Sequence, residues 1–437
     1  MIAGLRGGVI VTNHARDHVY PIAEAAFEAG YLRRLVTGVY YKPSTIAGRI
    51  LRAAAQRVSA RDLKRVEGRR AAIPDELVES VPLPELMEQA LGRTLARLGG
   101  DPRPATYLKC EAFDRATARR HVDRCAIFHG FEQCSLYSLR RARQLGAINV
   151  LDQPIIHRTE LDRIEREERA RMGVPLPARR PFWFQRHVDR KYAEHALTDY
   201  AFVPLDFVKR TMVKNGFAPD RVFLIPYAAE PKNYRPIDRP PRPGFNILYV
   251  GPLHYWKGLH YLLEMIPKLE IPGARLTIVG RAEPDWAPYF MPRIAALGDR
   301  VRYVPGVAHA EMEGVYADAD VLVFPSLVGG IGLVCYEAMA TGLPVITSDG
   351  DVVIRHGIDG LSAPLTDMGA WQRALGDLAG DRDRRRALGA AGAERVKTFT
   401  WDAYKRGIIA AYETIWERER GAGRGRGADQ AAVPMQR

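Results

Sequence analysis

Several features that mark other classes of protein are scarce or missing in this sequence. Only four cysteines occur in 437 residues and none has a CxxC spacing, which argues against a structural zinc site or a disulfide framework and fits a reducing compartment. The apolar run at the N-terminus is too short for a signal peptide. The most apolar long window, 321–346, contains Pro, Gly and Glu and is a poor membrane span. We therefore expect a cytoplasmic protein.

A dinucleotide-binding fingerprint is missing where it would be needed. The glycines of GLRGG stand before the first expected strand, Val9–Asn13, whereas GxGxxG would have to follow it. Asp318 and Asp320 flank Ala319, but they precede a strand, and ligand sites form at the opposite end of parallel strands. The sequence speaks against a dehydrogenase, and it predicts no bound cofactor and no metal site.

Acidic residues are outnumbered by basic residues in the first half only. Residues 1–243 contain 42 Lys+Arg and 28 Asp+Glu, a difference of +14, whereas residues 244–437 contain 22 and 23, a difference of −1; together these give the net charge of +13. A basic half suggests an anionic partner, such as anionic lipid, a phosphate-bearing acceptor or nucleic acid. A solvated, arginine-rich surface explains the excess equally well.

Residues 44–70 carry much of this charge. Ile46, Ile50, Ala54 and Val58 recur every four residues among many arginines, which suits a helix lying on an anionic membrane surface. An ordinary surface helix with a solvated face accounts for the same pattern, so both interpretations stay open. The first predicts a peripheral protein on the inner face of the cytoplasmic membrane.

The chain is organised around residues 321–347, VLVFPSLVGGIGLVCYEAMATGLPVIT. The order is a short apolar strand, a glycine-rich turn, a helix ended by Gly342 and a second strand. Such a unit places backbone N–H groups and a helix N-terminus at the carboxyl edge of a parallel sheet, where a diphosphate binds well. Glu337, one turn into the helix, can accept hydrogen bonds from ribose hydroxyls.

This stretch resembles the donor-binding signature of retaining glycosyltransferases with the GT-B fold, particularly glycosyltransferase family 4. PS, GIGL, EAMA and GLPV match that signature in order, but Gly329 stands where the family has its first Glu. An ordinary αβ unit of another doubly wound protein is the competing interpretation. The resemblance implies that the donor contacts Gly330, Ile331, Gly332, Leu333 and Glu337.

The segment FNILYVGPLHYWKG carries a second part of the resemblance. The family has Gly-Arg, four residues and Lys-Gly here, and its Arg and Lys hold the nucleotide diphosphate. Lys257 matches, whereas Pro252 stands in place of the Arg. The resemblance covers residues 245–364 well and the first domain only in outline. It also places the following turn residues at the donor: Gly251, Arg281, Gly306 and Val307.

The first half repeats strand and helix patterns. His129 and Asp152 each follow an expected strand, at the end where αβ domains bind ligands, and we predict that they are catalytic. Simple burial with a hydrogen bond explains either residue about as well. His14 and Arg16, in the loop after the first strand, are predicted to lie on the acceptor side.

The predicted fold class is α/β with GT-B architecture: two Rossmann-like domains facing across a cleft, and a C-terminal helix crossing back to the first. We expect the acceptor-binding domain over 1–230, a Pro-rich linker over 231–244 and the nucleotide-sugar-binding domain over 245–399. A crossing helix over 400–420 and a disordered tail over 421–437 follow.

The predicted function is metal-independent, retaining glycosyl transfer from a nucleotide-sugar to a saccharide or lipid-linked acceptor, such as a lipopolysaccharide or exopolysaccharide precursor. The expected partners are that donor, that acceptor and an anionic membrane surface, but no nucleic acid. A sugar-nucleotide epimerase and a non-catalytic GT-B partner protein are the alternatives. Gly329 weakens the epimerase, which needs carboxylates around the sugar. Gly329 and Pro252 favour the non-catalytic partner, whereas Lys257 and Glu337 oppose it.

Overall fold

The computed structural model describes residues 2–15, 18–58, 64, 66–229, 234–328, 332–348 and 354–422. Contacts divide the chain into two compact units. The first unit holds residues 1–152, 180–202 and 404–437, and the second holds 153–179 and 203–403. The sequence predicts a first domain that ends at residue 230. By their contacts, residues 203–224 belong to the second unit, although their last strand, β7 (Val222–Leu224), is part of the first sheet. The predicted domain boundary at residue 230 therefore stays a prediction.

The first sheet has seven strands within the described residues, in the order β3-β2-β1-β4-β5-β6-β7, and its strands run parallel wherever their pairing is described. Every residue of β1, β4, β5 and β6 is buried, as expected for a parallel sheet covered by helices on both faces. The strands are β1 (Val9–Asn13), β2 (Leu32–Thr37), β3 (Val78–Ser80), β4 (Ile127–Phe131), β5 (Ile148–Asp152), β6 (Tyr200–Val203) and β7 (Val222–Leu224).

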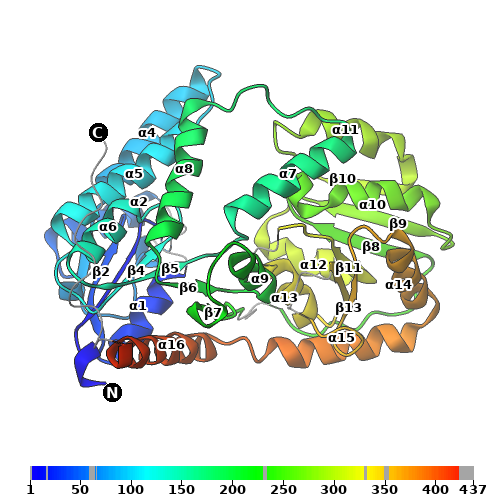
Figure 1. Ribbon diagram of the computed structural model, residues 1–437. Coiled ribbons are helices and arrows are strands. Elements are labelled where there is room, and N and C mark those ends of the chain that lie inside the picture. Colours follow the sequence, from blue (N-terminus) through cyan, green and yellow to red (C-terminus); the bar gives the residue numbers. More distant parts are fainter. Residues whose placement is uncertain are drawn as a thin grey trace. The chain divides into compact units, whose positions relative to one another are not determined.

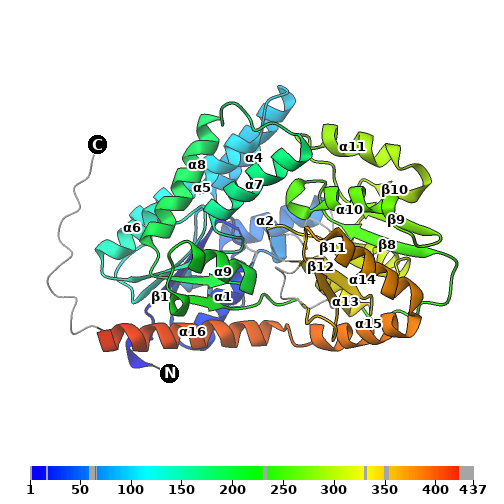
Figure 2. The same ribbon diagram turned by 45° about the vertical axis from the view of Figure 1, so that its right-hand side comes forward.

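The helices of the first unit form two groups. Helices α4, α5, α6 and α8 pack against one another, as Figures 1 and 2 show. Helix α16 lies beside α1 in both views, and Lys405 joins them through Glu24 and Glu28. The C-terminal helix therefore packs on the first unit, as predicted. The bounds are α1 (Val19–Glu28), α2 (Ile46–Val58), α4 (Leu83–Arg97), α5 (Arg103–Arg120), α6 (Leu136–Gln144), α8 (Phe182–Leu197) and α16 (Trp401–Ala422).

The second sheet is also parallel, with six described strands in the order β10-β9-β8-β11-β12-β13. The order places β8 and β11 together at its centre. The strands are β8 (Phe245–Val250), β9 (Ala274–Val279), β10 (Val301–Val304), β11 (Val321–Phe324), β12 (Val345–Ser348) and β13 (Leu361–Ala363).

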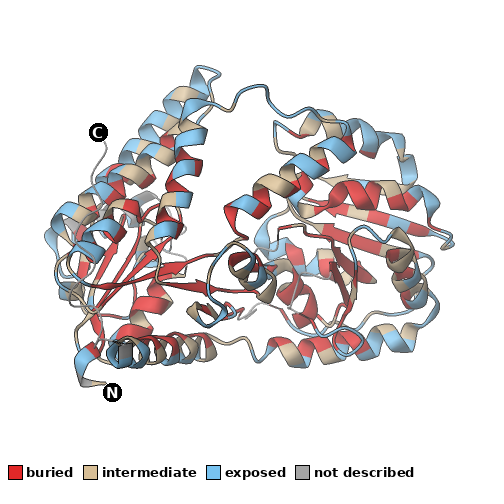
Figure 3. Ribbon diagram, viewed as in Figure 1, coloured by how far each residue is buried: buried red, intermediate tan, exposed pale blue. Residues whose placement is uncertain are grey.

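The helices of the second unit present buried residues inward and exposed residues outward, as the alternating colours of Figure 3 show. Helix α7 belongs here, because Glu168 accepts hydrogen bonds from His260 and Tyr261 of α10. The bounds are α7 (Arg158–Met172), α9 (Asp206–Lys214), α10 (Leu259–Met265), α11 (Ala287–Ala296), α12 (Met312–Ala317), α13 (Leu333–Ala340), α14 (Met368–Gly380) and α15 (Arg382–Val396).

Among the helices of the described residues, none combines the length and the apolar character that crossing a membrane requires.

Candidate functional site

The turns at the carboxyl edge of the second sheet approach one another more closely than side chains allow. A Cβ added to Gly280 would lie 1.8 Å from the carbonyl oxygen of Gly251, and one added to Gly258 would lie 1.9 Å from that of Pro325. Gly258 also has a φ of +68°, which residues with a side chain rarely adopt. Glycine at these positions lets the backbones that follow β8, β9 and β11 pack against each other.

Lys257 is fixed in place by this packing. It ends a short 3-10 turn, Tyr255–Lys257, and the amide of Leu327 donates to the carbonyl of Trp256 at 2.8 Å. This bond ties the turn to the segment that follows β11. The Nζ of Lys257 lies 5.2 Å from the centre of the Phe324 ring, within the range of a cation–π contact. The ammonium group is therefore held at the carboxyl end of β11.

The N-terminus of α13 meets the same aromatic ring. Its N-cap is Gly332, and a Cβ there would lie 3.4 Å from the ring of Phe324. Within the described residues, no hydrogen bond reaches the amides of Leu333 and Val334, the first two of the helix. A helix start with unbound amides and an ammonium group, both near the same ring, favour an anion. Gly329, Gly330 and Ile331 lie outside the described residues.

Glu337 is held by a tyrosine that the sequence analysis did not identify. The hydroxyl of Tyr316, a fully buried residue of α12, donates to Oε2 of Glu337 at 2.6 Å. Burial and then the negative charge of Glu337 raise the pKa of Tyr316, so this donor keeps its proton at neutral pH. Burial, followed by the same charge, raises the pKa of Tyr234 to about 12. The half-buried carboxylate of Glu337 therefore has a fixed orientation at this edge.

The remaining predicted donor residues lie in turns of the same unit. Arg281 is exposed, and its carbonyl accepts from the amide of Leu253 at 2.8 Å. Gly306 follows β10 and is exposed. Val307 is one of the residues that line a cavity of about 220 Å³ beside β8, β9 and β10. Pro252, at the position of the family's Arg, accepts a hydrogen bond from Tyr249 through its carbonyl. The structure thus brings Lys257 and Gly332 to the ring of Phe324, with Leu333 following Gly332 at the start of α13.

His129 and Asp152 lie on neighbouring strands of the first sheet. The strand that contains His129 is longer than the sequence indicates, because Gly130 and Phe131 continue its pairing with Leu151 and Asp152. His129 is consequently inside β4 rather than after it. Its imidazole has no exposed surface, and Nδ1 is 2.6 Å from the hydroxyl of Tyr412 on α16.

Burial lowers the pKa of His129 to about 3, so the ring is neutral at physiological pH. Asp152 is 2% exposed, and its charge contributes, after burial, to a raised pKa of Tyr404 and Tyr412. Both residues are therefore buried. Their catalytic roles stay a prediction.

The N-terminus of α6, at the carboxyl edge of the first sheet, is closed by carboxylates from other helices. Glu194 of α8 accepts from the amides of Ser135 and Leu136 at 2.9 and 3.1 Å. Asp114 of α5 accepts from those of Tyr137 and Ser138 at 2.7 and 2.9 Å. An anion would meet two carboxylates there, so α6 is a poor site for a diphosphate.

His14, predicted on the acceptor side, follows β1 and is half-buried. Its Nε2 lies 3.3 Å from the Sγ of Cys110 on α5. Arg16 lies outside the described residues. Nothing in the local pattern of the sequence indicates the Tyr316 contact to Glu337 or the Glu194 contact to α6, because each joins segments far apart in the chain.

Across the described residues, no group of three or more His, Cys, Asp or Glu side chains is arranged to hold a metal ion. The edge around Phe324 carries positive charge from Lys257 and from the start of α13.

Part of this sequence is similar to those of known proteins. Residues 244–381 match the family described as "Glycosyl transferases group 1". The chain is 30% identical over 223 residues to D-inositol 3-phosphate glycosyltransferase of Nocardia farcinica, covering 46% of this chain and 49% of that protein. It is 31% identical over 186 residues to phosphatidyl-myo-inositol mannosyltransferase of Mycolicibacterium smegmatis, covering 41% and 47%. The chain spans about half the length of these relatives. Over the matched residues, the resemblance to glycosyltransferases is confirmed.

Two solved structures share the fold over nearly the whole chain. Sucrose-phosphate synthase from Thermosynechococcus elongatus has a TM-score of 0.55 and 21% identity, covering 96% of this chain and 98% of its own. Anabaena Alr3699/HepE in complex with UDP has a TM-score of 0.57 and 13% identity, covering 93% and 99%. With the two parallel sheets, these likenesses confirm the predicted GT-B fold class.

Proposed function

We propose that this chain is a glycosyltransferase whose second unit binds a nucleotide-sugar and whose first unit binds the acceptor. The observation that carries the proposal is the pairing of Lys257 with the open N-terminus of α13 on the Phe324 ring. A diphosphate at this place is neutralised by one ammonium group and by the partial positive charge of the helix. Glu337, oriented by Tyr316, takes the ribose hydroxyls.

The proposed reaction retains the anomeric configuration and uses no metal ion. The leaving diphosphate accumulates charge in the transition state, and Lys257 with the α13 amides stabilises that charge in place of a cation. Retention requires either a protein nucleophile or a route in which the acceptor attacks from the side that the diphosphate leaves. Gly329 has no side chain and supplies no nucleophile, so we favour the same-side route, with the leaving phosphate taking the acceptor's proton.

A panel of nucleotide-sugars tests the donor. A ligand that binds only the folded state raises the melting temperature, so the right donor should give the largest shift. That donor should then release nucleoside diphosphate when an acceptor is added, and mass spectrometry should find no glycosyl adduct on the protein. Donor binding without any turnover would favour the non-catalytic alternative, and a covalent adduct would refute the same-side route.

The proposed acceptor is lipid-linked or otherwise anionic, and the protein binds an anionic membrane surface. Helix α2 supports this, because Ile46 and Ile50 are 70% and 64% exposed on a helix that also exposes Arg49, Arg52 and Arg57. One of the relatives above is named for phosphatidyl-myo-inositol, a lipid.

Liposome flotation tests the membrane part of the proposal. Vesicles with anionic lipid should carry the protein at low salt and lose it at high salt, because salt screens charges at the surface. Ile50→Glu should reduce flotation, whereas Leu98→Glu, at an equally exposed position outside α2, should not. No flotation at low salt would remove the membrane from the proposal.

A further inference from the structure

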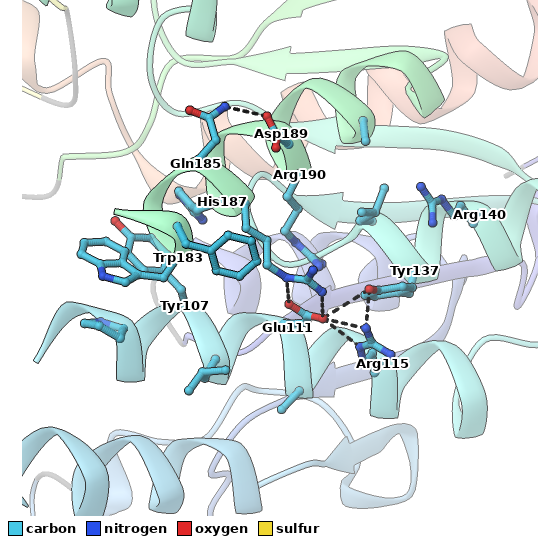
Figure 4. Close-up of a pocket in the computed structure, with 17 residues that line it drawn as sticks. Tyr107, Glu111, Arg115, Tyr137, Arg140, Trp183, Gln185, His187, Asp189 and Arg190 are labelled. Atoms are coloured by element: carbon cyan, nitrogen blue, oxygen red, sulfur yellow. Dashed lines mark hydrogen bonds and ion pairs between the residues drawn. The ribbon is translucent and has the colours of Figure 1, made fainter. Parts of the chain in front are cut away.

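A large pocket lies within the first unit, beside the closed N-terminus of α6. Helices α5, α6 and α8 line it, and its volume is about 880 Å³. Figure 4 shows Tyr107, Trp183 and His187 grouped at one end, and Arg115, Tyr137 and Arg140 at the other. The volume lies within the range of pockets that bind small molecules, about 300–1,000 Å³. The pocket is therefore polarised, with an aromatic end and a cationic end.

The aromatic end is apolar and open. The rings of Tyr107 and Trp183 stack with centroids 5.1 Å apart, and His187 lies 4.1 Å from Tyr107 on the other side. Beside them, Leu108 is 56% exposed and Phe182 is 80% exposed. Exposed apolar side chains around an open pocket favour burial against an apolar ligand.

The cationic end carries more positive than negative charge. Glu111 accepts hydrogen bonds from Arg186 at 2.7 and 3.0 Å and from Arg115 at 2.7 and 3.0 Å, so one carboxylate faces two guanidinium groups. Hydrogen bonds from Arg186 and then Arg115 lower the pKa of Glu111 to about 2, so it remains ionised. One positive charge is left over.

Arg140 adds a second positive charge. Its guanidinium lies 5.9 Å from the centre of the Tyr137 ring, and the guanidinium of Arg115 lies 4.4 Å from the centre of the same ring. Within the described residues it forms no ion pair, and it is exposed. Asp189, the other acidic residue of the lining, accepts from Gln185 at 2.8 Å and lies toward neither the aromatic nor the arginine group in Figure 4.

We propose that this pocket binds a lipid phosphate with a single or branched hydrocarbon chain. The hydrocarbon chain lies against Tyr107, Trp183 and Leu108. The phosphate lies at Arg140 and Arg186. The ligand has the same polarity as the pocket, an apolar tail and an anionic head. A planar guanidinium suits a phosphate, which it can bind through two hydrogen bonds. A neutral sugar would leave the excess positive charge unmatched, and a free phosphate would leave the aromatic end exposed.

This inference deepens the proposed lipid-linked acceptor and rests on it for its biological meaning, but the binding itself needs no donor. The test uses dodecyl phosphate below its critical micelle concentration, followed by calorimetry and by tryptophan fluorescence. The Trp183→Phe variant identifies how much of the signal comes from Trp183 among the six tryptophans. We expect binding to the full-length protein and a fluorescence change that this variant loses.

Three further probes separate the chemical contributions. Octyl phosphate should bind more weakly than dodecyl phosphate, by about two- to fourfold for each methylene removed. Inorganic phosphate alone should not bind detectably, and dodecyltrimethylammonium, with the opposite charge, should bind at least tenfold more weakly. Equal binding of dodecyl maltoside and dodecyl phosphate would overturn the role of the arginines.

Two exposed positions give variants that should fold normally. Arg140→Glu should weaken dodecyl phosphate binding by about three- to tenfold, and the loss should shrink at high salt. Leu108→Asp should weaken it by about tenfold at any salt concentration. Arg97→Glu and Leu98→Asp, at exposed positions on and just after α4 outside the pocket, are the matched controls and should leave binding unchanged.

The outcomes also separate this inference from the proposed function. If no amphiphile binds while sugar transfer is observed, the pocket proposal fails and the glycosyltransferase remains. If dodecyl phosphate binds with the expected pattern but no nucleotide-sugar is used, the proposed function fails and the lipid site remains. Binding that Arg140→Glu and Leu108→Asp both leave unchanged would place the amphiphile elsewhere and overturn the assignment.

Discussion

The two sheets have the same parallel construction, but the helix starts at their carboxyl edges differ. In the first unit, Glu194 and Asp114 bind the first amides of α6. In the second unit, the helix start at α13 has a glycine N-cap and an ammonium group nearby. The first edge is closed by side chains from other helices, and the second is built from close-packed glycine turns.

This difference lies in whether the amides at each helix start are already bound. A helix N-terminus attracts an anion only while its amides remain available. Internal carboxylates use those amides to hold a loop rigid, which stabilises the first unit and removes a phosphate site. Glycine turns leave the amides of the second unit available. Four predictions test this comparison.

Breaking the closed edge should destabilise the first unit strongly. Asp114 is fully buried and accepts hydrogen bonds from two α6 amides, the hydroxyl of Ser138 and Arg190. Asp114→Ala removes a carboxylate that neutralises the charge of the buried Arg190. The variant should therefore lose about 3–5 kcal/mol of unfolding free energy. Urea unfolding measures the loss, with the exposed Asp189→Ala as control. A loss below about 1 kcal/mol would contradict the structural role of this carboxylate.

Adding one methyl group to the open edge should disrupt it. Gly258→Ala combines a left-handed φ with a Cβ that meets the Pro325 carbonyl, and should cost about 2–4 kcal/mol. It should also weaken nucleotide diphosphate binding, because Lys257 is displaced. Gly298→Ala, with a φ of +50° and no atom within 4 Å of the added Cβ, should show only the smaller conformational cost. Thermal unfolding and calorimetry check both; equal effects would mean that the close approach is unimportant.

Removing side chains of the open edge should affect binding more than folding. Lys257→Ala and Glu337→Ala should each weaken nucleotide diphosphate binding by about tenfold or more, since a charge-assisted hydrogen bond contributes about 1.5–3 kcal/mol. The Lys268→Ala variant, at an exposed lysine of the same unit, serves as control. Titration calorimetry gives the affinities. If both alanine variants bind like the wild type, the nucleotide site lies elsewhere.

The fourth prediction concerns His129 and the pH dependence of stability. Its folded pKa of about 3 lies below the unfolded value of about 6.5, so below pH 6.5 the unfolded chain binds a proton that the folded chain does not. The contribution of His129 to the free energy of unfolding is present above pH 6.5. This contribution is lost as the pH falls toward 3, by at most about 1.4 kcal/mol per pH unit. His129→Gln should remove this slope in unfolding measurements between pH 4 and 7.

The same variant tests the predicted catalytic role. Reduced turnover at unchanged stability would support His129 at the site, whereas full activity of the variant would remove it. Unfolding whose pH dependence is the same in both proteins would instead show that His129 is not buried as the structure has it.

The backbone features at the carboxyl edge of the second sheet follow from local sequence, which is why they could be predicted. The apolar run Val321–Phe324, the glycines after it and the α13 pattern lie within one short stretch, and local spacing sets their backbone geometry. The Lys257-Gly258 turn is equally local. The position of His129 was less predictable, because a strand end depends on pairing with β5, and its burial depends on Tyr412, 283 residues away.

Local sequence patterns were enough to predict two parallel αβ sheets, a glycine-rich turn at the edge of the second and a basic first half. Periodicity, glycine spacing and charge are local properties, and they need no knowledge of which segments meet. Only the tertiary structure decided that Tyr316 orients Glu337, that Glu194 and Asp114 close α6, and that Glu111 and Arg186 meet across the α5–α8 pocket. These contacts join segments 21 to 75 residues apart, and packing alone selects them.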